Sequence, residues 1–189
     1  MNSRPSTART APRLLGVYLN DHLTGAGAGA DLIRRSARAH RGTPLGPPLA
    51  ALARDVVEDR DSLREIMTDL DVPVVRSRMV LGRLAEKAAR LKLNGRLVSR
   101  SPLSDVLELE GMRLGVEGKA CAWHTLQALA DDDPRVDGPR VEELLRRAER
   151  QIRTLDHLRG ERAEAVFTAD EAAGRHEARA HSGSGGRGK

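Results

Sequence analysis

Aromatic side chains are nearly missing from this chain, whose 189 residues include one Trp, one Tyr and one Phe. Proteins that bind single-stranded nucleic acid stack bases on aromatic rings, and this sequence lacks such a platform. The single cysteine, Cys121, excludes an internal disulfide and fits a reducing compartment. No uncharged apolar stretch approaches the roughly 20 residues that cross a bilayer, and residues 1–13 lack the apolar segment of a secretory signal. We therefore expect a cytoplasmic protein without a transmembrane segment.

Charge of opposite sign is concentrated in two successive segments. Residues 51–71 hold seven acidic and three basic side chains, whereas residues 74–96 hold seven basic and one acidic. Such neighbours favour docking of one segment on the other over a nucleic-acid-binding face. The net charge of +5 is therefore not interpreted as a nucleic-acid footprint, and nucleic acid is a disfavoured partner. Formation of a homo-oligomer stays open.

The spacing of apolar residues predicts an all-α chain with five helices. Strand-like alternation is absent, and β-branched residues are sparse. Proline and glycine residues mark the starts and stops of the segments. The expected helices cover residues 12–40, 47–70, 74–93, 101–130 and 137–167. We expect one domain, residues 11–167, between disordered polar tails at residues 1–10 and 168–189.

Four of these helices carry apolar residues at alternating steps of three and four, which is typical of an antiparallel four-helix bundle. Segment 74–93 is shorter and basic, and at about 1.5 Å per residue it would span about 30 Å, roughly a bundle length. We therefore expect it to lie in a long crossover between the second and third bundle helices. The predicted inward stripes are Leu15, Tyr18, His22, Gly25, Gly29 and Leu32; Leu49, Leu52, Val56, Asp59, Leu63, Ile66 and Leu70; Leu103, Leu107, Glu110, Leu114, Glu117, Cys121 and His124; and Val141, Leu145, Ala148, Ile152 and Leu155.

Glycines recur inside two of the predicted helices. Gly25 and Gly29 lie four residues apart in the first, and Gly111, Gly115 and Gly118 lie in the helix 101–130. A glycine inside a helix costs about 1 kcal/mol relative to alanine, so a run of them needs a structural reason. Small residues let two helix backbones approach closely, which predicts a glycine seam between these helices. The alternative is a flexible kink in the first helix.

Four polar residues occupy core-type positions: His22, Asp59, Glu110 and Glu117. Burying a lone charge is costly unless the charge is paired or binds a metal. Carboxylates and a histidine that converge from facing helices could hold iron or manganese. Alternatively, the carboxylates could pair with Arg60, Lys87, Arg113 or Lys119 in an ionic network that fixes helix register, with His22 hydrogen-bonded to Tyr18 or to a carboxylate.

Four stretches of the sequence are distinctive: LGVYLNDHL (15–23), LKLNGR (91–96), SPLS (101–104) and LEGMRLGVEGK (109–119). Together with the helix pattern, they resemble a group of ferritin-like proteins from actinobacteria over residues 11–167. The resemblance implies an all-α, ferritin-like antiparallel four-helix bundle with an additional basic helix in the long crossover. It also implies that His22, Asp59 (or Glu58), Glu110 and Glu117 match the superfamily's metal ligands.

One departure from that family pattern concerns the ligand motif. Ferritin-like di-iron proteins supply ligands from Glu-x-x-His on two helices, and this sequence contains no Glu-x-x-His. The missing motif favours the ionic network over a di-iron oxidase.

Three functions therefore compete at this point. The first is a ferritin-like bundle that binds one or two metal ions. The second is a non-enzymatic interaction or structural protein on a degenerate ferritin-like scaffold. The third is a basic surface on helix 74–93 that contacts a membrane or nucleic acid, with its apolar residues docked on the bundle.

Overall fold

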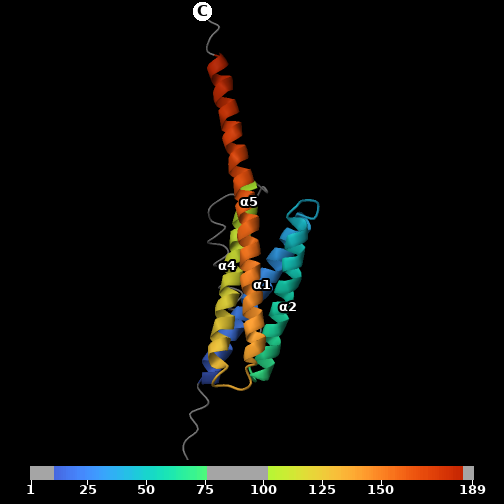
Figure 1. Cartoon of the computed structure of the whole chain (residues 1–189), viewed down its shortest axis with the longest axis vertical. Helices are drawn as coiled ribbons and strands as arrows, with labels where there is room; N and C mark the ends of the chain where they lie inside the picture. The colour runs from blue at the N-terminus through green and yellow to red at the C-terminus, as the bar shows by residue number, and fades with distance from the viewer. Residues whose placement is uncertain (1–10, 76–101, 185–189) are drawn as a thin grey trace, which may run out of the picture.

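Four long helices form the part of the chain that the structure describes, residues 11–75 and 102–184 of a computed structural model (Figure 1). They are α1 (Ala11–Ala39), α2 (Gly46–Asp69), α4 (Pro102–Leu129) and α5 (Gly138–Ser184). No strand occurs within these described ranges. The predicted all-α class is confirmed, and the starts and ends of α1, α2 and α4 agree with the expected helices to within one or two residues.

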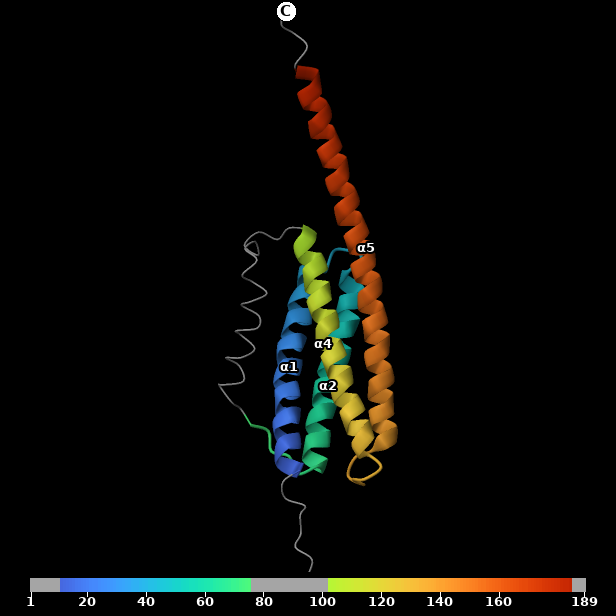
Figure 2. The ribbon, with the colours of Figure 1, turned by 90° about the vertical axis from the view of Figure 1, so that its left-hand side faces the viewer.

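The helices pack as two antiparallel hairpins, α1 with α2 and α4 with α5. Helix α1 also packs on α4, while α2 contacts α5 less than any other neighbouring pair. Both views show that α2 and α4 run in the same direction, so the end of α2 and the start of α4 lie at opposite ends of the bundle (Figures 1 and 2). This is the order of directions expected for a bundle with one long crossover.

The apolar stripes predicted for α2 and α5 do form the core. All seven predicted residues of α2 are buried, and so are Val141, Leu145, Ala148 and Leu155 of α5. Helix α2 begins at Gly46, with prolines in its first turn, and its end is marked by Asp71 in a left-handed conformation (φ 57°). The Val72 N–H then donates to the carbonyl of Met67, which closes the helix end.

The stripe predicted for α4 was wrong. Leu103, Leu107, Leu114, Cys121 and His124 are exposed. The buried apolar residues of this helix are instead Val106, Leu109, Met112, Val116, Ala120, Ala122, Trp123 and Leu126. Both sets follow helical spacing, because this helix carries apolar residues on two faces, and periodicity therefore does not distinguish the inner face.

The glycine seam was also wrong. Helices α1 and α4 are neighbours as predicted, but a Cβ added at Gly25, Gly29, Gly111, Gly115 or Gly118 would meet no atom within 4 Å. The contact is made by the flanking side chains, as where the Tyr18 hydroxyl lies 3.1 Å from the Thr125 hydroxyl. These glycines therefore do not serve close backbone packing.

The predicted helix 74–93 falls almost wholly outside the described residues. Val74 and Val75, where it was expected to begin, are not helical. Asn20 of α1 holds this stretch, because its amide donates to the Pro73 carbonyl (3.0 Å) and its oxygen accepts from the Val75 N–H (2.7 Å). The chain that leaves α2 is thus fixed to the side of α1 as far as Val75.

Helix α5 is longer than expected. The sequence predicted an end near Phe167, but the helix continues to Ser184 and projects beyond the other three (Figures 1 and 2). Alanine, glutamate and arginine dominate residues 161–180, and these residues favour a helix without tertiary packing. No helix in the described part of the chain is long and apolar enough to cross a bilayer.

Candidate functional site

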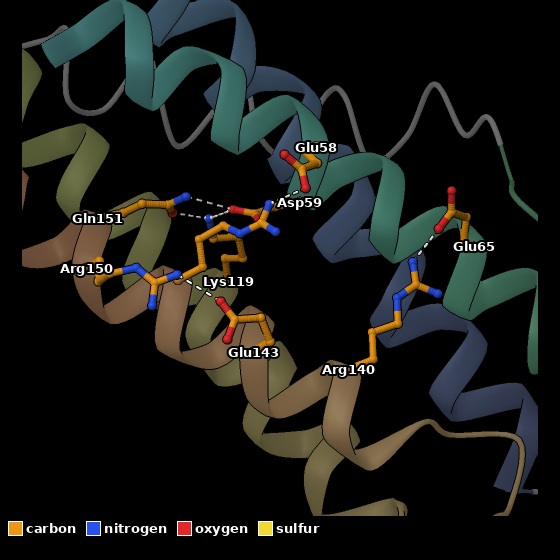
Figure 3. A network of polar contacts seen from close by, with 9 residues as sticks. Glu58, Asp59, Glu65, Lys119, Arg140, Glu143, Arg150 and Gln151 are labelled. Carbon is orange, nitrogen blue, oxygen red and sulfur yellow. Dashed lines mark hydrogen bonds and ion pairs between the residues drawn. The ribbon is translucent and has the colours of Figure 1, made fainter.

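A fully buried carboxylate, that of Asp59, lies at the middle of α2 and faces the interior of the bundle (Figure 3). The Lys119 ammonium of α4 donates to Asp59 Oδ2 and also to the Gln151 side-chain oxygen of α5. Gln151 in turn donates from Nε2 to Asp59 Oδ2 at 3.0 Å. Three side chains from three helices thus close a ring of hydrogen bonds.

Arg147 of α5 completes the cluster from the solvent side. Its Nη1 lies 3.3 Å from Asp59 Oδ1 and 2.9 Å from Glu58 Oε1. The Asp59 contact is an ion pair without hydrogen-bond geometry. Both oxygens of Asp59 therefore face a positive charge, and we call Asp59, Lys119, Arg147 and Gln151 the central network.

The electrostatics of Lys119 reflect this burial. Burial lowers the pKa of the Lys119 ammonium below its ordinary range, and the neighbouring Asp59 carboxylate acts in the opposite direction. The nearby Arg147 guanidinium lowers the Lys119 pKa further. A lysine held by two acceptors in this way positions helices rather than presenting a free amine.

The other predicted ligands lie elsewhere. Glu110 and Glu117 are on the outer part of α4, with side chains 46% and 52% exposed. Glu117 pairs with Arg113 at 3.5 Å, and Glu110 lies 4.0 Å from Arg159. Their outward position follows from the misassigned stripe of α4.

His22 makes an aromatic contact instead of a hydrogen bond to a carboxylate. Its ring packs edge-on against Tyr18, with centroids 4.4 Å apart. Partial burial lowers the His22 pKa below its ordinary value, although the charge of Asp21 opposes this effect. Neutral imidazole is therefore favoured at neutral pH.

His22, Asp59, Glu110 and Glu117 do not come together in the structure. Within residues 11–75 and 102–184, no group of three or more His, Cys, Asp or Glu side chains is arranged to hold a metal ion. Asp59 instead pairs with Lys119, one of the cations that the sequence offered for an ionic network. Of the two arrangements that the sequence left open, the geometry at Asp59 matches the ionic network.

Sequence reasoning missed two members of the central network, Arg147 and Gln151. Gln151 follows Leu144 and Ala148 along the buried face of α5, and a polar residue in that position was the available signal. Arg147 carried no comparable signal, because it is one of many arginines along this helix.

A second buried carboxylate, Asp105, was also missed. It lies in the first turn of α4, where acidic residues are common for reasons of the helix dipole alone. Here it accepts two hydrogen bonds from the Arg162 guanidinium of α5, at 2.7 and 3.1 Å, and lies 3.3 Å from His40 Nε2. This cluster fastens the start of α4 to α5 and to the end of α1.

Both clusters hold separate parts of the bundle together: the central network joins α2, α4 and α5, and the Asp105 cluster joins α4, α5 and the turn that follows α1. Comparisons of the chain with family models, with curated proteins and with solved structures gave no match.

Proposed function

We propose that this chain is a non-enzymatic interaction protein built on a ferritin-like helical bundle, with the central network as its structural lock. The observation that carries the proposal is the state of Asp59. Its two oxygens are engaged by Lys119, Gln151 and Arg147, which come from two other helices. A carboxylate filled in this way fixes helix register, as a buried polar group does in a coiled coil.

The order of helix directions supports the ferritin-like part of the proposal. Helices α2 and α4 run in the same direction, so the chain leaves α2 and enters α4 at opposite ends of the bundle, as it does at a long crossover (Figure 2). Ferritin-like bundles have one such long connection, whereas up-and-down bundles have none.

The outer face of α4 supports the interaction part. Leu103, Leu107 and Leu114 lie along one side of this helix and are 45%, 52% and 64% exposed. Exposed apolar side chains that share a face are typical of surfaces that bind other molecules.

Metal analysis tests the proposal against its main rival, a metal site at His22, Asp59, Glu110 and Glu117. The full chain is purified from iron- and manganese-supplemented medium and measured by elemental analysis. We expect well below one equivalent of metal per chain and no thermal shift when either ion is added.

Two variants sharpen this test. Asp59→Asn should lower stability without changing the metal content, and Glu110→Ala should change neither. One or two equivalents of metal in the unaltered chain, lost in both variants, would overturn the proposal and restore the metal site.

A further inference from the structure

A groove of about 900 Å³ opens on the side of the bundle where α2 faces α5, with the end of α1 forming part of its wall. Ala50, Ala53, Val57 and Leu144 form its apolar floor. Helices α2 and α5 pack against each other sparsely, and polar bridges such as Arg147 to Glu58 span the gap between them.

The groove is lined by more arginines than its carboxylates pair with. Each of its four carboxylates has an arginine partner: Glu58 pairs with Arg147, Glu65 with Arg140, Asp61 with Arg60 and Arg64, and Glu143 with Arg146 and Arg150. Figure 3 shows Glu65 with Arg140 between α2 and α5, and Glu143 with Arg150 along α5.

Three further arginines line the same groove without such a partner. Arg34 and Arg38 lie one turn apart on α1, and Arg54 lies on α2. All three are exposed, and none forms an ion pair with any residue in the described portions of the chain. The groove therefore carries an excess of positive charge at the end formed by α1 and the first half of α2.

We infer that this groove binds an amphipathic helix of a partner protein that carries acidic residues at one end. The apolar side of such a helix would cover the alanines, Val57 and Leu144, and its carboxylates would pair with Arg34, Arg38 and Arg54. This inference rests on the proposed interaction function; it adds a second surface to the outer face of α4 and names the class of partner that this second surface binds.

The lining favours a peptide over a nucleic acid. The rest of the groove is lined by the paired carboxylates Glu58, Asp61, Glu65 and Glu143, and it therefore lacks the continuous row of unpaired cations that a phosphate backbone needs. The proposed partner helix carries its acidic groups at one end only, and its apolar face matches the floor.

The length of the groove fits a short helix. Its lining on α2 runs from Ala50 to Glu65, which is about 22 Å at 1.5 Å per residue. A helix of about four turns would occupy this length.

The test uses a fluorescein-labelled synthetic peptide of about 16 residues, with Ala and Leu on one face and three Glu near one end. Its control has the three Glu replaced by Gln. Binding to the full chain is followed by fluorescence anisotropy at low and at physiological salt. We expect the acidic peptide to bind at least about tenfold more tightly than its control, since the control lacks the three ion pairs.

Two matched pairs of protein variants locate the site. Arg34→Gln with Arg38→Gln and Arg54→Gln should weaken binding about tenfold. The control triple Arg35→Gln, Arg41→Gln and Arg153→Gln removes the same charge from exposed positions outside the groove, and should leave affinity within about twofold. Ala50→Leu should weaken binding by partly filling the floor, whereas Ala28→Leu on the exposed side of α1 should not.

Circular dichroism and thermal melting show that each variant is folded. Equal losses in the two arginine triples, tighter binding of a DNA duplex than of the peptide, or no peptide binding at millimolar concentration would each overturn the groove assignment. If the chain is metal-free while the peptide fails to bind, only the groove inference is overturned. Stoichiometric metal at Asp59 would instead overturn the interaction function itself.

Discussion

Lys119 of α4 donates a hydrogen bond to Asp59 of α2 across 60 residues of sequence. The two helices run parallel and belong to different hairpins. Because Gln151 of α5 bonds both side chains, a shift of any of the three helices by one residue would break at least one of these contacts. The pair therefore determines how the hairpins dock.

Removal of the lysine tests this role. Lys119→Met leaves the Asp59 carboxylate buried with fewer donors, and we expect the free energy of unfolding to fall by about 3 kcal/mol. Urea denaturation monitored by circular dichroism measures the change. Asp61→Asn, at a partly exposed pair on the same helix as Asp59, is the control and should cost less than about 1 kcal/mol.

The double variant Asp59→Leu with Lys119→Met tests whether an apolar pair can replace the buried ion pair. Because buried ion pairs are often replaceable by apolar groups, we expect it to recover most of the stability lost in Lys119→Met. A double variant no more stable than the single one would show that the apolar pair does not fit and that packing, rather than charge, dominates at this site.

The open space around the helix glycines predicts that their replacement stabilises the chain, unlike the substitutions at Asp59 and Lys119. Gly25→Ala and Gly115→Ala should each raise the free energy of unfolding by about 0.5–1 kcal/mol, because an added Cβ meets nothing and the helix gains propensity. Gly46→Ala is the contrast: its Cβ would clash with the His40 carbonyl oxygen, and this substitution should destabilise the chain. Destabilisation by Gly25→Ala and Gly115→Ala would restore the close-packed seam.

Acidification should weaken the fold through His22. Its pKa is lowered in the folded state, so between its ordinary value near 6.5 and the lower folded value the unfolded chain binds the extra proton. Stability contributed by neutral His22 is therefore present above about pH 6.5 and is lost as pH falls. Thermal melting of His22→Gln should show a smaller decrease below about pH 6.5 than the unaltered chain.

His124 provides the control for that experiment, because it is exposed on α4. His124→Gln should retain the pH profile of the unaltered chain. The assignment to His22 fails if both glutamine variants change the profile alike.

The Asp105 cluster should hold the end of the bundle from which α5 projects. Asp105→Asn weakens the two hydrogen bonds from Arg162 and the contact to His40, and we expect a loss of about 2 kcal/mol because charged donors are left underpaired. Hydrogen exchange should then accelerate in the first turns of α4. Asp133→Asn, in the loop after α4, should leave exchange there unchanged.

The fold could be predicted wherever one face of a helix was clearly apolar. In α2, Asp59 interrupts an otherwise unbroken series of buried leucine, valine and isoleucine, so its inward position was visible in the sequence. In α4, both Leu107 and Leu109 lie in apolar stripes, and only contact with α1 and α5 selects the second. Because the wrong face of α4 was assigned to the core, Glu110 and Glu117 were included in the predicted site.

The partners of Asp59 were harder to predict for a different reason. Lys119 was among the expected candidates. However, the periodicity of one helix does not show which residues of another helix lie at the same level along the bundle axis. The Gln151 contact spans 92 residues, and its identity depends on the relative translation of two hairpins. That translation is set by packing as a whole.

The bracing of the Pro73 region by Asn20 has a consequence for the order of assembly. The groups involved, from Gly16 to Val75, all belong to the first half of the chain. The α1–α2 hairpin can therefore acquire its brace on the ribosome before α4 and α5 are synthesised. The later hairpin would then meet a preformed template, and refolding from denaturant, where all segments are released together, would follow a different time course from biosynthesis.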